Sequence, residues 1–194
     1  MPIDVKIISE AESKTILNLQ ENHFCDLKAI DIEPGKLTRS IASFANADGG
    51  EIYVGIDENR TTNSRFWRGF SAPELANGHI QTFEALFPLS NDFDYTFLEC
   101  NNLPGLILQI QIRKTSAIKK ASDGKVYLRR GAQNLPITTH DGLKQLEFVK
   151  GITSFEVETV NTDESYITES QPTYDFMQYL VPSRCCSDSI VFPY

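Results

Sequence analysis

The sequence predicts an α+β (mixed α/β) domain followed by an acidic tail. Segments with apolar residues at three- and four-residue steps, typical of helices, are interspersed with segments in which apolar and polar residues alternate, typical of strands. Hydrophobic residues make up 41% of the 194 residues, which is enough for a packed core. This pattern ends near Gly151, beyond which the chain is acidic and poorly periodic.

The first half of the domain is predicted to contain two helices, each followed by a strand. Helical spacing covers 8–19, and 22–30 alternates like a strand. After a Pro-Gly pair, a second helical stripe runs to Gly49 and Gly50, where glycine ends the helix. That stripe consists of Leu37, Ile41, Phe44 and Ala45. A second strand is expected directly afterwards, at 51–57, with Asp57 at its end.

The second half is predicted to contain two helices and three strands after a polar loop at 59–70. The helices are expected at 72–87, where Pro73 lies in the first turn, and at 139–150. The strands are expected at 93–100, 106–113 and 125–130.

The tail carries most of the chain's net charge of -8. Residues 151–194 contain seven acidic residues and one basic residue, Arg184. We expect a domain at 1–158 and an acidic tail or linker at 159–194, in which 174–180 form a short docking helix.

No feature of the sequence indicates membrane insertion or secretion. No apolar run approaches the roughly 20 residues of a membrane-spanning helix, and Met1–Glu10 mixes charged and apolar residues, unlike a secretory signal. The four cysteines, Cys25, Cys100, Cys185 and Cys186, lack the spacing of zinc ligands. We therefore expect reduced thiols, no zinc site, no membrane partner and a cytoplasmic location.

Positive charge is concentrated between Arg113 and Arg130, where Asp123 is the only acidic residue. Seven basic residues fall within these 18: Arg113, Lys114, Lys119, Lys120, Lys125, Arg129 and Arg130. Such a run forms either a solvated face or a binding patch for phosphates.

The stretch from Glu21 to Asp57 resembles the Schlafen AlbA-type domain, a domain of bacterial proteins also described as DNA-binding or divergent ATPase-like. The matching elements are Glu21, Asp26-Leu27-Lys28, Ser43-Phe44-Ala45-Asn46, Gly49-Gly50, Gly55-Ile56-Asp57, Trp67-Arg68-Gly69-Phe70 and Val126 to Ala132. The resemblance covers about residues 10–158 and implies a single lobe with a mixed β-sheet packed by helices. Phe44, Asn46 and the two glycines are explained by a helix stop and a tight turn. The chain has no Gly-x4-Gly-Lys-Ser/Thr motif, so we expect no ATP site.

Three acidic residues are the candidate metal ligands. A carboxylate among apolar neighbours is costly to bury unless it is paired, protonated or bound to a metal. If their strands are adjacent, Asp26 and Asp57 converge, and Glu21 completes a hard-oxygen site for Mg²⁺ or Mn²⁺. In nuclease-active members of the family, three carboxylates at matching positions cleave structured RNA, and Lys28 would stabilise the transition state. Asp26 replaces the usual Glu, and salt bridges to Lys28 and Arg39 are the alternative interpretation.

The basic residues are the candidate contacts to a sugar-phosphate backbone. The loop at 59–70 contributes Arg65 and Arg68, and the later segment contributes Lys119, Lys120, Arg129 and Arg130. Beside the loop arginines, Trp67 and Phe66 stack on an unpaired base in one interpretation. In the other, Trp67 and Phe70 attach the loop to the core.

The leading hypothesis is therefore a nucleic-acid-processing domain that acts as a divalent-metal-dependent endoribonuclease on tRNA or another structured RNA. A role in antiphage defence follows from family analogy alone. Nuclease-active eukaryotic relatives have two lobes that form a clamp, so a single lobe implies a homodimer. The alternatives are a non-catalytic DNA- or RNA-binding module and a protein-interaction or sensor module.

Overall fold

The computed structural model describes residues 4–59, 61–62, 64–87, 92–154 and 163–180. The chain divides into two compact units, Met1–Ser154 and Phe155–Tyr194. The domain boundary predicted at 158 lies outside the described residues. None of the described helices is long and apolar enough to cross a membrane.

A five-stranded mixed sheet forms the centre of the first unit, with strand order β1-β6-β7-β3-β2. Two neighbouring pairs are parallel, β1 with β6 and β2 with β3, and the other two are antiparallel. The strands are β1 (Val5–Ile7), β2 (Cys25–Lys28), β3 (Gly50–Val54), β6 (Phe93–Glu99) and β7 (Leu106–Ile112). The sheet and its helices confirm the predicted α+β class.

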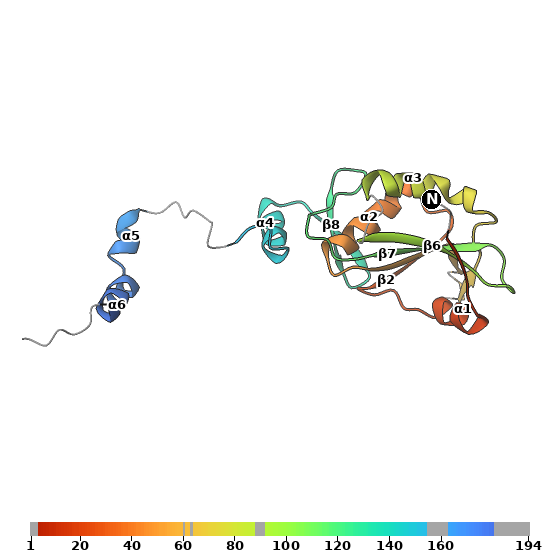
Figure 1. Cartoon of the computed structure of the whole chain (residues 1–194), viewed down its shortest axis with the longest axis horizontal. Helices are drawn as coiled ribbons and strands as arrows, with labels where there is room; N and C mark the ends of the chain where they lie inside the picture. The colour runs from red at the N-terminus through yellow and green to blue at the C-terminus, as the bar shows by residue number, and fades with distance from the viewer. Residues whose placement is uncertain (1–3, 60, 63, 88–91, 155–162, 181–194) are drawn as a thin grey trace, which may run out of the picture. The chain divides into compact units, whose positions relative to one another are not determined.

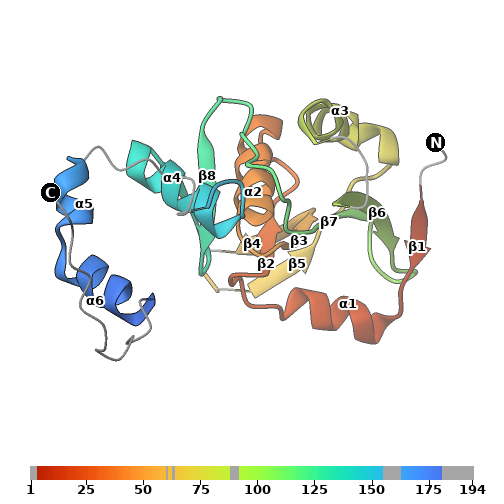
Figure 2. The same cartoon turned by 60° about the vertical axis from the view of Figure 1, so that its left-hand side comes forward.

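Both faces of the sheet are covered. Helices α2 (Pro34–Asn46) and α3 (Asn77–Leu86) lie on one side and α1 (Glu10–Leu17) on the other, as Figures 1 and 2 both show. The hairpin of β4 (Ile56–Asn59) and β5 (Ser64–Trp67) packs into the core on the α1 side. The alternation within β3 follows this division, because Ile52 belongs to the core under α2 and Tyr53 to the core under α1.

A second hairpin covers the outer side of α2. It consists of β8 (Val126–Arg130) and β9 (Gln133–Ile137), and the chain then continues into α4 (His140–Val149). Because α2 is enclosed between the sheet and β8, even its serines Ser40 and Ser43 are buried. The 3-10 turn η1 (Pro73–Ala76) directly precedes α3.

The end of α2 confirms the architectural role expected for its motif. Asn46 Nδ2 donates to the carbonyl oxygens of Lys119 (2.8 Å) and Tyr127 (2.9 Å), and its Oδ1 accepts from the Lys119 N–H. Gly49 has a φ of 80°, and a Cβ there would lie 2.6 Å from the Ile112 carbonyl oxygen. The turn therefore requires glycine for its conformation and for space.

Two predicted elements near the site were wrong. The strand expected at 51–57 is broken at Gly55, whose φ of 116° turns the chain out of the sheet into β4. The Gly55 N–H still donates to the Lys28 carbonyl oxygen, while its own carbonyl accepts from the Arg68 and Gly69 N–H groups. The segment 59–70, expected as a loop, contains β5. Strands β1 and β9 were not predicted.

In the second unit, the described residues 163–180 form two short helices, α5 (Glu164–Thr168) and α6 (Gln171–Leu180). Asp163 caps α5 by accepting from the Ser165 N–H and hydroxyl, and these hydrogen bonds lower the pKa of Asp163. The helix expected at 174–180 is part of α6. Several apolar side chains of this unit are exposed: Tyr166, Ile167, Tyr174, Phe176 and Met177.

Candidate nucleic-acid interface

Asp26 lies on the edge strand β2 and is 1% exposed. Its Oδ1 accepts from Lys28 Nζ at 2.7 Å and lies 3.5 Å from Arg129 Nη2. Its Oδ2 is buried and has no hydrogen-bond partner among the described residues. Two cations therefore compensate the cost of burying this carboxylate.

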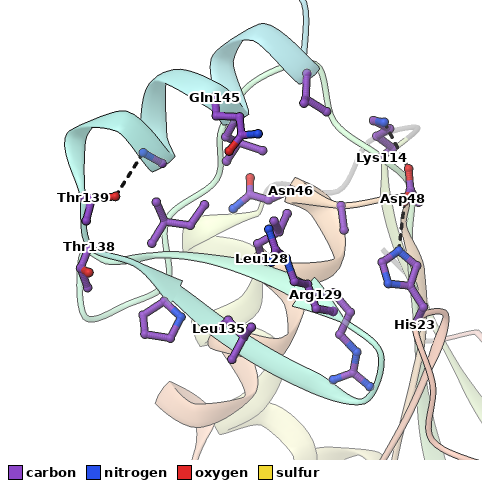
Figure 3. Close-up of a pocket in the computed structure, with 17 residues that line it drawn as sticks. His23, Asn46, Asp48, Lys114, Leu128, Arg129, Leu135, Thr138, Thr139 and Gln145 are labelled. Carbon is purple, nitrogen blue, oxygen red and sulfur yellow. Dashed lines mark hydrogen bonds and ion pairs between the residues drawn. The ribbon is translucent and has the colours of Figure 1, made fainter.

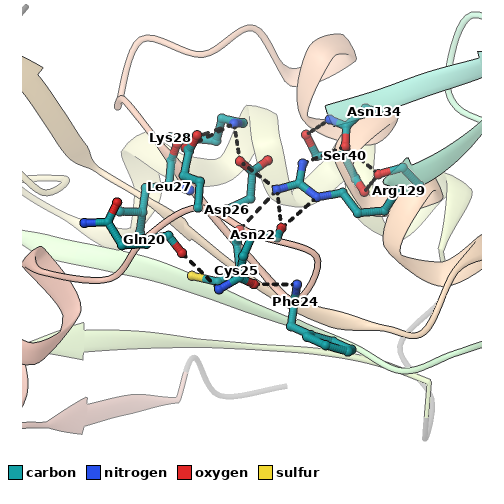
Figure 4. Close-up of polar contacts among 12 residues, drawn as sticks. Gln20, Asn22, Phe24, Cys25, Asp26, Leu27, Lys28, Ser40, Arg129 and Asn134 are labelled. Carbon is teal, nitrogen blue, oxygen red and sulfur yellow. Dashed lines mark hydrogen bonds and ion pairs between the residues drawn. The ribbon is translucent and has the colours of Figure 1, made fainter. Parts of the chain in front are cut away.

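Arg129 connects three parts of the fold, as Figure 4 shows. Its guanidinium donates to the carbonyl oxygens of Asn22 (2.9 and 3.1 Å) and Cys25 (3.1 Å), and to Asn134 Oδ1 (2.8 Å). It also lies 4.6 Å from the centroid of the Phe44 ring on α2. At 2% exposure it is enclosed by protein, so the prediction that Arg129 contacts nucleic acid was wrong. It holds β8 against β2 and α2.

Glu21 and Lys28 complete this cluster. Glu21 Oε1 accepts from the Leu27 N–H at 3.1 Å and lies 3.9 Å from Lys28 Nζ. The structure therefore brings together three of the predicted site residues, Glu21, Asp26 and Lys28, with the lysine ammonium as their shared cation.

Asp57 lies apart from these residues, on β4. Its Oδ2 is 3.0 Å from Arg68 Nη1, which also binds Asp31 Oδ2 at 2.6 Å, and its Oδ1 accepts from the Ile30 N–H. The hydrogen bonds that Arg68 donates to Asp31 and to Asp57 raise the pKa of Arg68. The turn at Gly55 is the physical reason why Asp57 does not join the cluster, because it places Asp57 on the β4–β5 hairpin instead of on β3 beside β2.

The three carboxylates consequently do not form the shared metal site that we predicted. Within the described ranges, no group of three His, Cys, Asp or Glu side chains is placed to hold a metal ion. Asp26 and Asp57 each form an ion pair with their own basic partner, as the alternative interpretation required, although with Arg68 and Arg129 rather than Arg39. The residues present do not fit Mg²⁺ or Mn²⁺ in this arrangement.

The cations of the β4–β5 hairpin are largely used within the fold. Arg65 Nη1 donates to the Leu19 carbonyl oxygen and its side chain is 17% exposed, whereas Arg68 is 47% exposed but doubly paired. Trp67 is buried, and its Nε1–H donates to the Gly105 carbonyl oxygen at 3.2 Å. Trp67 therefore attaches the hairpin to the core, which is the second of the two alternatives that the sequence left open. Phe66 is 48% exposed.

Around the end of α2, in contrast, basic side chains reach the surface. Lys120 and Arg130 are exposed, and Lys119 is half-buried with its Nζ 5.5 Å from the centroid of the Phe93 ring. Lys114 Nζ lies 3.2 Å from Asp48 Oδ1, and His23 Nε2 lies 3.0 Å from Asp48 Oδ2. These two contacts lower the pKa of Asp48, that with His23 most, so the carboxylate of Asp48 is paired with basic side chains at this place.

Lys150 adds to the positive charge at this surface. Its ammonium donates to the carbonyl oxygens of Ala45 (3.0 Å) and Thr115 (2.5 Å), which places it at the C-terminal end of the α2 dipole. Burial, followed by repulsion from Lys114 and Lys119, lowers the pKa of Lys150 to about 8. Lys114 and Lys119 therefore disfavour the charged form of Lys150.

A groove of about 540 Å³ opens at the same place, between α4, the β8–β9 hairpin and the turn after α2 (Figure 3). Its apolar lining comes from Leu128, Leu135, Pro136, Ile137, Leu146 and Val149. Its polar lining includes His23, Asp48, Lys114, Arg130, Thr138 and Gln145. Sequence reasoning identified Arg130 but missed the groove, because its walls come from segments far apart in the chain.

Comparison with known proteins gives the family. Residues 21–138 match the model of the Schlafen AlbA_2 domain, which is more than half of the chain. The chain belongs to the Schlafen AlbA_2 family. This membership makes it a nucleic-acid-related domain, as the motifs predicted. The matched residues of the AlbA_2 domain include Asp26, Arg129 and the β8–β9 hairpin but end before α4.

Two solved structures are similar to this AlbA_2 chain, both with low sequence identity. The DIP2311 protein from Corynebacterium diphtheriae has a TM-score of 0.47 and 15% identity over 71% of this chain and 31% of its own. The N-terminal domain of an ATP-dependent DNA helicase RecG-related protein from Nitrosomonas europaea has a TM-score of 0.45 and 14% identity over 67% of this chain and 87% of its own. The chain thus spans less than a third of the first of these proteins. No curated protein matches the sequence.

Proposed function

We propose that this AlbA_2 domain is a non-catalytic nucleic-acid-binding module that holds the sugar-phosphate backbone on the cationic surface around the groove. One observation carries the proposal: Lys114 and Arg130 line the groove, and the exposed Lys120 follows Lys119, whose N–H and carbonyl are bound by Asn46 at the end of α2. Such a concentration of positive charge is favourable when phosphates replace the condensed counterions of a nucleic acid.

The state of the carboxylates supports binding without catalysis. Asp26 is buried between Lys28 and Arg129, and Asp57 is held by Arg68. A carboxylate whose charge is already compensated by basic side chains attracts a metal ion less strongly, and Arg129 cannot leave without exposing its own buried partners.

The test compares two double variants with the same change in charge. Lys120→Glu/Arg130→Glu alters the cationic surface, while Lys14→Glu/Lys36→Glu alters exposed lysines at the α1 surface and at the start of α2. Binding of labelled tRNA and of duplex DNA is followed by fluorescence anisotropy at low salt. We expect the first variant to lose most of the affinity and the second to stay close to the wild type. Equal losses would show that only net charge matters and would contradict the proposal.

A second candidate function is a metal-dependent endoribonuclease acting on tRNA or another structured RNA. The observation in its favour is that Glu21 and Asp26 converge on one cation, Lys28, while Asp26 Oδ2 has no described partner. Total tRNA is incubated with and without Mn²⁺ and resolved on a denaturing gel, for the wild type and for Glu21→Gln. Mn²⁺-dependent cleavage by the wild type that is lost in Glu21→Gln would establish this candidate and overturn the non-catalytic one.

We also propose that two copies associate, as a clamp around nucleic acid would require. The outer edge of β1 supports this: Val5 is 40% and Ile7 67% exposed, and no described strand pairs with that edge. Light scattering is expected to give twice the chain mass for the wild type and the single mass for Ile7→Lys. A single mass for both would refute the dimer.

We further propose a role in antiphage defence. Its test is a phage plating assay, in which cells that carry Lys120→Glu/Arg130→Glu are expected to lose the protection that the wild type gives.

A further inference from the structure

The floor of the groove is an apolar surface that the fold leaves open. Leu135 on β9 is 39% exposed and Val149 on α4 is 64% exposed, and both line the groove with Leu128. In Figure 3, Leu135 lies on the hairpin below α4, and Gln145 extends from the helix above it. An open apolar floor between two walls is suited to a flat, weakly polar group that water solvates poorly.

The rim of the groove is polar and basic, in contrast to its apolar floor. Lys114, His23 and Arg130 line its edge, and the carboxylate of Asp48 is already compensated by the first two. Thr138 and Gln145 bring hydrogen-bonding groups to the wall, and no described residue is hydrogen-bonded to the Gln145 side chain. A ligand that fits both parts has an uncharged planar portion joined to a negatively charged one.

The volume of the groove limits the size of the ligand that it can enclose. About 540 Å³ lies within the roughly 300 to 1,000 Å³ range of sites that enclose small molecules, so the groove can take a nucleobase but not a duplex. A base reaches such a site only when it is unpaired, because paired bases face each other inside the helix. The upper wall, α4, lies beyond residues 21–138, so the groove depends on a helix outside the part that matches the family model.

We infer that the groove between α4 and the β8–β9 hairpin binds one unpaired base of a nucleic-acid strand, with the neighbouring phosphates on Lys114 and Arg130. The inference rests on the proposed nucleic-acid binding and specifies its substrate class as single-stranded or locally unpaired nucleic acid. Phosphate contacts supply affinity, and the groove adds a preference for strands that still carry their bases.

The experiment uses three labelled 12-mers with the same backbone charge per strand: an oligouridine, an abasic strand of the same length, and a fully paired duplex. The variant Leu135→Gln/Val149→Gln makes the floor polar without changing charge. Its control, Leu75→Gln/Ile152→Gln, alters two apolar residues of similar exposure, 63% and 50%, outside the groove. Thermal unfolding establishes that all three proteins are folded.

For the wild type we expect the oligouridine to bind about tenfold more tightly than the abasic strand, the gain of burying one base. The groove variant should lose this preference and keep its affinity for the abasic strand and the duplex, and the control should behave as the wild type does. Equal binding of oligouridine and abasic strand by the wild type overturns the inference while the proposed function survives. Absence of salt-sensitive binding to all three probes overturns both.

Discussion

Replacing Arg129 by methionine tests the packing that supports the whole site. Methionine fills a similar volume but lacks the guanidinium, which makes four hydrogen bonds to Asn22, Cys25 and Asn134. The substitution also removes one of the two cations that compensate the buried carboxylate of Asp26. Breaking a buried ion pair by removing one partner costs about 3 to 5 kcal/mol. Since domains of this size are stable by only about 5 to 15 kcal/mol, Arg129→Met is expected to lose about a fifth or more of the unfolding free energy.

The assay is urea unfolding followed by the fluorescence of the one tryptophan, Trp67, which is buried in the core under α1. Arg130→Met is the matched control. Because Arg130 is the exposed neighbour of Arg129, this substitution should change the unfolding free energy by no more than about 0.5 kcal/mol. Arg129→Lys keeps the charge but not the planar fork of donors, so we expect an intermediate loss. An Arg129→Met protein within about 1 kcal/mol of the wild type would refute the reasoning.

Three further predictions concern single residues. Gly49→Ala should destabilise the domain by at least about 2 kcal/mol in the same assay, since a Cβ there meets the Ile112 carbonyl at 2.6 Å and φ is positive; an unchanged midpoint would contradict this account of the turn. The pKa of Lys150 is lowered to about 8 in the folded state, which binds fewer protons than the unfolded state above that pH. The unfolding free energy of the wild type relative to Lys150→Met should therefore rise between about pH 8 and the unfolded pKa and be level below about pH 8, where both states carry the proton; a difference that is flat over the whole range would show that burial does not shift this group. Burial, with Glu51 and Asp26, raises the pKa of Cys25 to about 11, so iodoacetamide should label it in urea but scarcely in the native protein at pH 8.5, and equal rates would argue against a buried thiol.

Much of the fold could be predicted because its elements are strongly periodic. The stripe of Leu37, Ile41 and Phe44 identifies α2, and the alternation of 106–113 identifies β7. The break at Gly55 could not be predicted with the same certainty, because a glycine inside an alternating segment is compatible with a continuous strand. Strand β1 has three residues, too few for a period to be recognised.

The site was predicted less well than the fold, for a physical reason. Adjacent residues of a strand face opposite sides, so Arg129 and Arg130 could not both be surface contacts, but which one faces inward depends on where β8 packs. That choice is made by α2 and β2, whose positions no local pattern encodes. The partner of Asp57 was likewise decided by the turn at Gly55. The groove is a tertiary feature, since α4, β9 and the turn after α2 meet there only in the folded chain.

The most direct test of the central claim is the salt dependence of tRNA binding, measured as the slope of log K against log salt for the wild type and Lys120→Glu/Arg130→Glu. If the surface around the groove holds phosphates, the wild type has a steep negative slope, and the variant's slope is smaller in magnitude by about two phosphate contacts. A wild-type slope near zero, or the same slope in both proteins, would contradict the claim that this surface binds nucleic acid.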